Sequence, residues 1–386
     1  MLGDSLNRPR MRLRQKLWQV HWIFLFLLCL TASIGIATLY SAAGKNNAGS
    51  FDPWASRQLV RFAAGMVILI AVAVVDIRIW LRYAYVFYGA SFVLLAAVEV
   101  AGSIGMGAQR WIDLGFVTLQ PSEVIKLALV MALARYFHGG NIEDVGRIPW
   151  LVPPLLMVAA PAAFVMRQPD LGTAVMLMIV GGAIFFVAGV RLWKFAVIGI
   201  AAICSIPVVW QFLHEYQQKR VLTFFDPESD PLGAGYHIIQ SKIALGSGGL
   251  FGKGFLKGTQ SHLNFLPEKQ TDFIFTMLAE EWGLIGGLAL IGLYFLILAY
   301  GVAISARCRS QFGRLLGLGV TATFFLYVFI NIAMVMGMIP VVGVPLPLIS
   351  YGGTAMLTLL VGFGLLMGVY IHRDVDIGRR GASEEI

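Results

Sequence analysis

The chain has 386 residues, of which 58% are hydrophobic and only 13% are charged, and its mean hydropathy is +0.77. Because soluble globular proteins carry about 25% charged residues, this composition excludes a soluble protein and predicts an all-α integral membrane protein. The formal net charge of +8 does not indicate a nucleic-acid partner, because the basic residues lie in short connections between apolar runs.

Apolar runs of membrane-spanning length predict a polytopic bundle of about ten transmembrane helices. Their approximate limits are 19–41, 58–76, 82–102, 121–137, 149–166, 172–190, 193–213, 273–302, 315–338 and 354–371. The bundle is therefore expected to occupy residues 19–371 as one transmembrane domain.

Basic residues precede the first run and fill every second connection, which is the positive-inside pattern of membrane proteins. They are Arg8, Arg10, Arg12, Arg14, Lys16, Arg78, Arg82, Arg191, Lys194, Arg307, Arg309, Arg314, Arg373, Arg379 and Arg380. The pattern predicts a basic cytoplasmic N-terminus over residues 1–18 and a cytoplasmic tail over residues 372–386. With both termini cytoplasmic, the number of spans must be even.

Two connections on the predicted outer side carry most of the polar sequence. Ser103–Gln120 has mixed polarity, which suggests a segment that lies in or dips into the membrane interface. A large extracytoplasmic loop, about 214–271, joins the seventh and eighth helices. Within it, Tyr236–Leu245 could form a helix at the membrane surface, with Ile239 and Ile243 on one face.

Asp272 is a carboxylate at the start of the eighth apolar run, where polar sequence meets the membrane. A charged group at membrane depth costs on the order of ~3 kcal/mol, so such a group is a functional candidate. Thr276 and Glu280 follow at spacings of four, broadly along one stripe of a helix. The alternative is that Asp272 is the N-cap of that helix, although Thr271 could take this capping role instead.

Glu123 and Lys126 are a second candidate, because residues three apart in the fourth apolar run meet on one helix face. An intramembrane pair of opposite charge indicates function by default. The alternative is a structural ion pair that fixes the packing of this helix.

Basic residues also lie on the predicted outer side, against the positive-inside bias. They are Arg57, Arg110, Arg167 and Arg220. As a set they suggest a site for a polyanionic substrate, since Arg binds phosphate in bidentate fashion. Helix capping or snorkelling to the lipid headgroups is the alternative for each. Gln168 and Asp170 open the sixth span, where Asp170 fits ordinary capping or a place beside the substrate.

Pro340–Thr354 interrupts apolar sequence with prolines and glycines and contains Ser350. Irregular backbone at membrane depth is tolerated where it is buried in protein or lines a cavity. The segment therefore predicts a cavity wall, and a sharp turn between the last two helices is the alternative.

Five segments together resemble the SEDS family, the shape, elongation, division and sporulation proteins. They are Arg110–Gly115, Gln120–Glu123 with Lys126, Gln168–Thr173, Phe265–Glu268 with Thr271–Phe275, and Pro345–Gly353. The resemblance covers almost the whole chain and is strongest to the elongation member, with the division member as the close alternative. Gln270 departs from the family, in which a His often precedes the Thr-Asp pair.

The resemblance implies a peptidoglycan glycosyltransferase in the bacterial inner membrane, with its active site facing the periplasm. Such an enzyme polymerises lipid II into a nascent glycan strand for cell elongation and cell shape. Its implied partners are a class B penicillin-binding protein, which is the transpeptidase, and membrane proteins of the elongation complex. Asp272 falls on the essential aspartate of the family, which would act as a general base in an inverting transfer.

The same resemblance places Arg110 and Lys126 on basic positions that are important for activity, and Glu123 in the same cavity. The full set of expected substrate-binding residues is Arg57, Arg110, Glu123, Lys126, Gln168, Asp170, Arg220, Lys269 and Ser350. No metal ligands can be assigned, although a divalent cation, Mg²⁺ or Mn²⁺, is compatible with a pyrophosphate substrate. A lipid II flippase and a non-catalytic scaffold for cell-wall enzymes remain as alternative functions.

Overall fold

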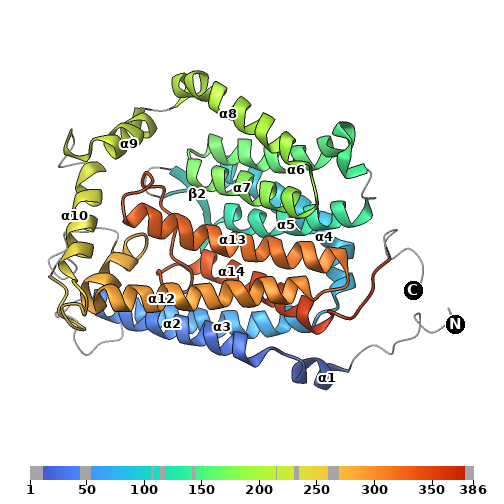
Figure 1. Cartoon of the computed structure of the whole chain (residues 1–386), viewed down its shortest axis with the longest axis horizontal. Helices are drawn as coiled ribbons and strands as arrows, with labels where there is room; N and C mark the ends of the chain where they lie inside the picture. The colour runs from blue at the N-terminus through green and yellow to red at the C-terminus, as the bar shows by residue number, and fades with distance from the viewer. Residues whose placement is uncertain are drawn as a thin grey trace.

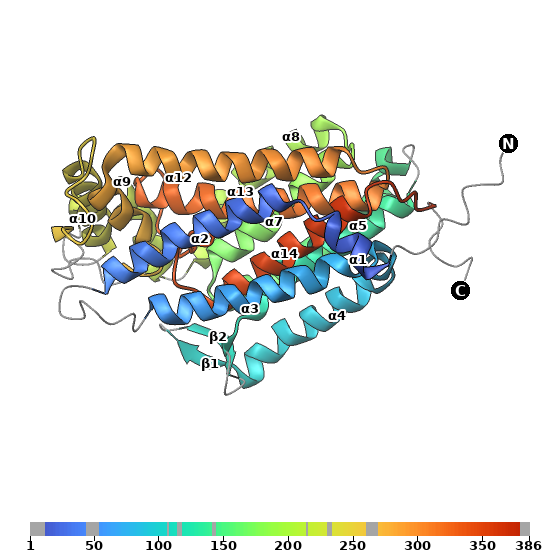
Figure 2. The same cartoon turned by 90° about the horizontal axis from the view of Figure 1, so that it is seen from below.

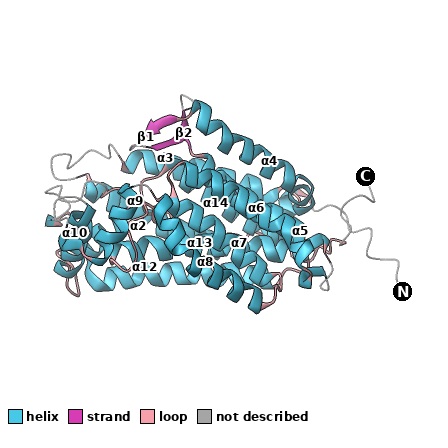
Figure 3. Ribbon diagram, turned by 90° about the horizontal axis from the view of Figure 1, so that it is seen from above, coloured by secondary structure: helices cyan, strands magenta, loops and turns pink. Residues whose placement is uncertain are grey.

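The computed structural model describes residues 12–43, 54–105, 108–113, 118–140, 144–213, 215–229, 234–259 and 269–378. Long helices run roughly along one common direction, and a small sheet lies at one edge of the bundle (Figure 1, Figure 3). The predicted all-α polytopic membrane fold is therefore confirmed.

Each of the ten predicted spans corresponds to one described helix. These helices are α2 (Trp22–Ala42), α3 (Ala55–Val74), α4 (Ile77–Ala101), α5 (Pro121–Gly139), α6 (Ile148–Arg167), α7 (Leu171–Val187), α8 (Leu192–Phe212), α12 (Ile274–Ala306), α13 (Gln311–Val335) and α14 (Gly353–Ile371). Seven of them are long and apolar enough to cross a membrane, and the apolar parts of α7 and α8 are shorter. The remaining helix, α5, carries Glu123, Lys126 and Arg135, which lower its apolar character.

The core of the bundle lies around α13 and α14. In each of these helices 67% of the most apolar stretch is buried, against 22% in α4. The peripheral helices turn apolar side chains outward, and Val67 of α3 and Val86 of α4 are among the most exposed. Such faces suit the hydrocarbon of a bilayer, which is as apolar as they are.

Basic groups predicted to be cytoplasmic share one end of the bundle where the structure describes them. The short helix α1 (Leu13–Trp18) lies there, because Lys16 Nζ donates to the carbonyl of Val74 (2.8 Å) at the end of α3. At the same end the Arg309 amide donates to the carbonyl of Arg373 (3.0 Å). α9 (Glu215–Phe225) and α10 (Ala234–Ser247) lie at the opposite end (Figure 2).

The connection between α4 and α5 contains a three-stranded antiparallel sheet that the sequence did not predict. Its strands are β1 (Ser103–Gly105), β2 (Ala108–Asp113) and β3 (Thr118–Leu119), in the order β1-β2-β3. β2 pairs with β3 through Ile112 opposite Leu119 and Asp113 opposite Thr118. The sheet places Arg110 of β2 above the start of α5, where the site described below is formed.

α10 confirms the helix predicted over Tyr236–Leu245 and shows how it is held. Ser241, which is fully buried, donates to the carbonyl of Val335 at the end of α13 (2.8 Å) and bonds to Thr276 of α12 (3.0 Å). Ile243 lies on the opposite side and is 47% exposed. The face of α10 that packs on the bundle therefore carries Ile238 and Ala244, both buried, together with Ser241, which finds its hydrogen-bond partners there.

α12 is broken at Gly283, and the loop that follows α10 fills the break. Gly283 has φ +68°, and a Cβ there would lie 2.3 Å from the backbone nitrogen of Gly252. The loop and the helix exchange four backbone hydrogen bonds: Lys253 N to Glu280 O, Gly254 N to Glu281 O, Leu284 N to Gly249 O, and Ile285 N to Leu250 O. Since a helix break at the membrane boundary otherwise leaves peptide groups unpaired, the loop replaces the bonds that α12 loses.

Candidate active site

A cavity of about 480 Å³ opens where α5, α7, α13 and α14 meet the loops beside them. Five of the ten candidate residues line it: Arg110, Glu123, Lys126, Asp170 and Asp272. The segments 341–345 and 351–355 form much of the remaining wall. Arg110 and Ala355, which are 245 positions apart in the sequence, thus face one space.

Asp272 lies immediately before α12 and is half-buried at the cavity wall. The N-cap of α12 is Phe273, whose side chain makes no capping hydrogen bond. The N-cap position is therefore one residue after Asp272 and two after Thr271, the two positions considered for it. Gly343 lies against the carboxylate, because a Cβ there would be 3.3 Å from Asp272 Oδ2.

Three successive backbone carbonyls before α12 are held by hydrogen bonds. The donors are Tyr351 N to Gln270 O (2.8 Å), Ser350 Oγ to Thr271 O (2.6 Å) and Asn331 Nδ2 to Asp272 O (2.9 Å). Two of these donors belong to the segment between α13 and α14, and the third belongs to α13 itself. The backbone at Asp272 is therefore fixed by parts of the chain that are distant in sequence.

Glu123 and Lys126 form the predicted pair on α5, with Lys126 Nζ 2.7 Å from Glu123 Oε1. Both are almost fully buried, with 4% and 2% of their surface exposed. Tyr327 of α13 completes the group: its hydroxyl donates to Glu123 Oε2 and accepts from Lys126 Nζ. Each charge is thus satisfied inside the bundle, as a buried charge requires.

Arg110 and Asp170 form a second polar group on the opposite wall. Arg110 donates to the carbonyls of Gln168 (3.2 Å) and Pro169 (2.6 Å) and lies 3.8 Å from the Asp170 carboxylate. Asp170 also caps α7, since it accepts from Thr173 N (3.2 Å) and Thr173 Oγ1 (2.9 Å). The capping prediction for Asp170 is confirmed, and the same residue faces the cavity.

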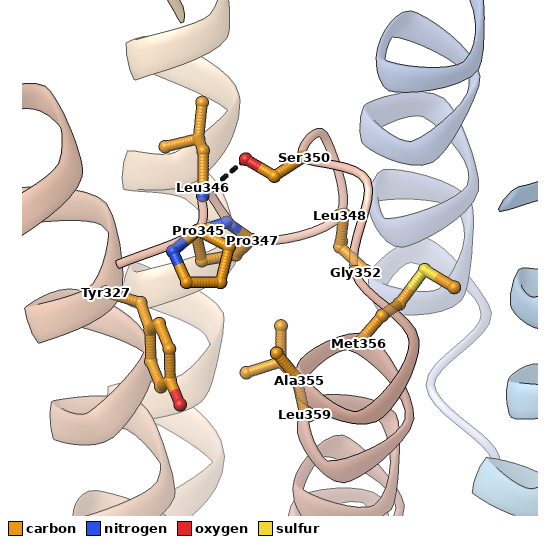
Figure 4. A pocket seen from close by; sticks show the side chains of 10 residues that line it. All are labelled: Tyr327, Pro345, Leu346, Pro347, Leu348, Ser350, Gly352, Ala355, Met356 and Leu359. Carbon is orange, nitrogen blue, oxygen red and sulfur yellow. Dashed lines mark hydrogen bonds between the residues drawn. The ribbon is translucent and has the colours of Figure 1, made fainter. Parts of the chain in front are cut away.

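The segment Pro340–Thr354 forms a wall of the cavity, as predicted. Gly343 has φ +73°, a conformation that favours glycine, and it lies where the segment passes Asp272. The segment is held from α12 by Tyr294, whose hydroxyl donates to the carbonyl of Pro347 (2.7 Å). Behind the wall lies a smaller pocket of about 20 Å³, in which Ser350 Oγ accepts from the Leu346 amide (Figure 4).

Four of the other candidate residues, Arg57, Gln168, Lys269 and Ser350, are not among the described residues that line the main cavity. Gln168 is buried and donates to the carbonyl of Leu95 (3.0 Å), which ties α6 to α4. Arg57 is exposed on α3, and Ser350 bonds within the wall. Burial lowers the pKa of Lys269, which is 7% exposed. The side chain of Arg220 lies outside the described part of the structure.

Sequence reasoning missed Tyr327 and Asn331. Both lie in the apolar sequence of α13. A single tyrosine or asparagine in such a sequence gives no sign of a functional role. Their spacing of four was the available signal, because it places two polar groups on one face of a spanning helix. Their partners, in α5 and before α12, could not be inferred from that spacing.

The charges at the cavity do not form a protein-only metal site. Among the described residues, no group of three or more His, Cys, Asp and Glu side chains is placed to hold a metal ion. Two cationic and three acidic residues line the cavity, so an entering polyanion meets no net positive charge there.

Comparison with known proteins identifies the family. The family model for the cell cycle proteins FtsW, RodA and SpoVE matches residues 21–375. The chain belongs to this family. Peptidoglycan glycosyltransferase MrdB of Escherichia coli strain K12 is 45% identical over 366 residues, which cover 92% of this chain and 95% of that protein. A probable peptidoglycan glycosyltransferase FtsW of Trichlorobacter lovleyi is 35% identical and covers 90% of this chain and 92% of that protein.

Solved structures of family members share the fold. A chain of a peptidoglycan synthase complex that coordinates polymerisation and crosslinking superimposes with a TM-score of 0.77 at 34% identity, covering 92% of this chain and 98% of that chain. The rod shape-determining protein RodA of Thermus thermophilus superimposes with a TM-score of 0.69 at 29% identity, covering 92% of this chain and 97% of that chain. The membership of the family that the sequence motifs predicted is confirmed.

Proposed function

We propose that the chain is a peptidoglycan glycosyltransferase that polymerises lipid II for cell elongation and cell shape. The observation that carries the proposal is the cavity in which Asp272 and the Glu123–Lys126 pair face one space, within a membrane protein 45% identical to MrdB. The site would face the periplasm from the bacterial inner membrane, with both termini in the cytoplasm. The clustering of basic residues at the opposite end from α10 supports this orientation.

Asp272 is the general base of the proposed reaction. Its carboxylate accepts the proton from the 4-hydroxyl of the acceptor N-acetylglucosamine as that oxygen attacks the anomeric carbon of the donor glycan. The bond from that carbon to the lipid pyrophosphate breaks in the same step, with inversion. The leaving group departs as a stabilised anion and needs no protonation, so one carboxylate suffices, unlike the pair in glycoside hydrolases.

Arg110 and Lys126 stabilise the charge that develops on the pyrophosphate. Both face the cavity, although each already contacts an acidic partner, Asp170 and Glu123 respectively. A divalent cation bound mainly by the substrate phosphates, as Mg²⁺ often is, would add positive charge. The isoprenoid chain of lipid II belongs in the bilayer beside the peripheral helices.

The proposed partners follow from the same assignment. A class B penicillin-binding protein would crosslink the new strand, in keeping with the synthase complex to which a similar chain belongs. Other membrane proteins of the elongation complex would join them. The division role remains the alternative, and depletion of the protein distinguishes the two, since rounded cells indicate elongation and filaments indicate division.

Polymerisation of purified lipid II by the solubilised chain with its partner tests the proposal. Asp272→Asn keeps the size of the side chain but removes the base, so glycan strands should not form while the protein remains folded. Asp226→Asn is the matched control, because Asp226 follows α9 in the same outer connection and does not line the cavity. Wild-type polymerisation by Asp272→Asn would overturn the assignment, and transport of lipid II across vesicles without polymerisation would favour a flippase.

A further inference from the structure

Two polar side chains of α13 connect the two halves of the candidate site. Tyr327 and Asn331 are four residues apart and lie one helical turn, about 5.4 Å, from each other along α13. Tyr327 bonds both members of the Glu123–Lys126 pair, and Asn331 bonds the backbone of Asp272. One face of α13 thus contacts both the buried Glu123–Lys126 pair and the backbone at Asp272.

Asn331 makes two contacts with a single amide group. Nδ2 donates to the carbonyl of Asp272 (2.9 Å) and to the carbonyl of Val344 (2.7 Å). Val344 follows Gly343, which is the residue that lies against Asp272 Oδ2. The amide therefore ties down the backbone that carries the carboxylate and also the wall on which the carboxylate rests.

The surroundings of Asn331 are not those of a side chain selected only for packing. It has no exposed surface, and its Oδ1 has no hydrogen-bond partner among the described residues. An unpaired buried oxygen is destabilising by about 1–3 kcal/mol, so the oxygen of the amide does not account for an asparagine at this position. The donating half of the amide is the half that the site uses.

We propose that Asn331 is a positioning residue of the transfer reaction, which holds Asp272 at a fixed place relative to the Glu123–Lys126 pair. The inference rests on the proposed function of Asp272 as the base. Asn331 does not touch the substrate, and it acts through the backbone at Asp272 and Val344. A misplacement of about 1 Å at a reacting group can lower a rate about 100-fold, so loss of these two hydrogen bonds should lower turnover even in protein that remains folded.

Asn331→Leu tests the proposal in the full-length chain, because Leu has nearly the shape of Asn and offers no donor. We expect kcat for lipid II polymerisation to fall about 10- to 100-fold, with KM within about twofold of wild type. The unfolding midpoint should fall, because the carbonyls of Asp272 and Val344 lose their donor, and removal of the unpaired Oδ1 offsets part of this loss. Thr321→Val is the matched control: Thr321 is a buried polar residue of α13 whose hydroxyl bonds only within its own helix (2.7 Å).

The outcomes separate this inference from the function on which it rests. If Asp272→Asn is inactive and Asn331→Leu has wild-type kcat, the positioning role is overturned and the base assignment stands. If Asp272→Asn is fully active, the base assignment fails first. A lower unfolding midpoint with wild-type kcat per folded molecule in Asn331→Leu would show a purely structural role and overturn the proposal. Asn331→Ser, which is too short to reach Asp272, carries the same expectation should Asn331→Leu fail to insert.

Discussion

The buried pair of Glu123 and Lys126 allows a quantitative test of whether it serves packing or catalysis. At a separation of 2.7 Å, two unit charges attract by about 6 kcal/mol if the effective dielectric constant is about 20. Removal of one partner leaves the other charge buried and destabilises a protein by roughly 3–5 kcal/mol. Lys126→Met and Glu123→Gln should therefore each lower the free energy of unfolding by several kcal/mol.

The double variant separates the two roles. With both charges absent no lone charge is buried, so its stability should return to within about 1–2 kcal/mol of wild type. If the pair is only structural, polymerisation also returns. If Lys126 stabilises the leaving pyrophosphate, as proposed, the double variant should be stable but about 100-fold slower.

Unfolding can be followed by tryptophan fluorescence during titration with SDS in mixed micelles, since the chain has nine tryptophans. Asp374→Asn is the control, because Asp374 is exposed and its pairing with Arg373 spans 4.0 Å, so less than about 1 kcal/mol should be lost. Lys126→Met with the stability of wild type would refute the reasoning from burial. Recovery of both stability and turnover in the double variant would refute the catalytic role.

Two further predictions concern the cavity wall and the end of α14. Gly343→Ala should lower kcat about 10-fold, because a left-handed conformation is destabilising by roughly 1–2 kcal/mol for other residues and the new methyl group presses on Asp272. Gly189→Ala is the control and should leave kcat unchanged, because Gly189 has φ +94° but open space around it. Burial lowers the pKa of His372 below its ordinary 6.5, so the unfolded state binds more protons in this range and stability falls as pH drops below about 6.5. His372→Gln should flatten this dependence of the unfolding midpoint, and an unchanged slope would contradict the assignment.

Much of the fold was predictable because long apolar runs have one stable form in a bilayer. A helix satisfies its own backbone hydrogen bonds, so each run became a helix within a few residues of its predicted limits. The sheet of β1, β2 and β3 was missed because its strands are very short. The break at Gly283 was also missed, because the bonds that stabilise it come from residues 249–254.

The candidate site was predictable where a charge stood in apolar sequence, as at Glu123, Lys126 and Asp272. Charge indicates that a residue needs a partner, but it does not say which. Gln168 and Ser350 donate hydrogen bonds to backbone carbonyls of the protein instead of facing the cavity, and Arg57 is exposed. Asn331 carries no charge, so only the folded chain reveals that it joins Asp272 to Val344.

The break in α12 has a mechanical consequence for the outer loop. Separation of residues 249–254 from α12 would break four backbone hydrogen bonds and expose their peptide groups at the edge of the bilayer, which would cost several kcal/mol. The loop and the helix therefore move as one body, although 25 or more residues separate them in sequence. Glu280 and Glu281, whose carbonyls accept from the loop, lie in the same helix eight and nine residues after Asp272, so a force applied to the loop is transmitted to the helix that begins beside the carboxylate.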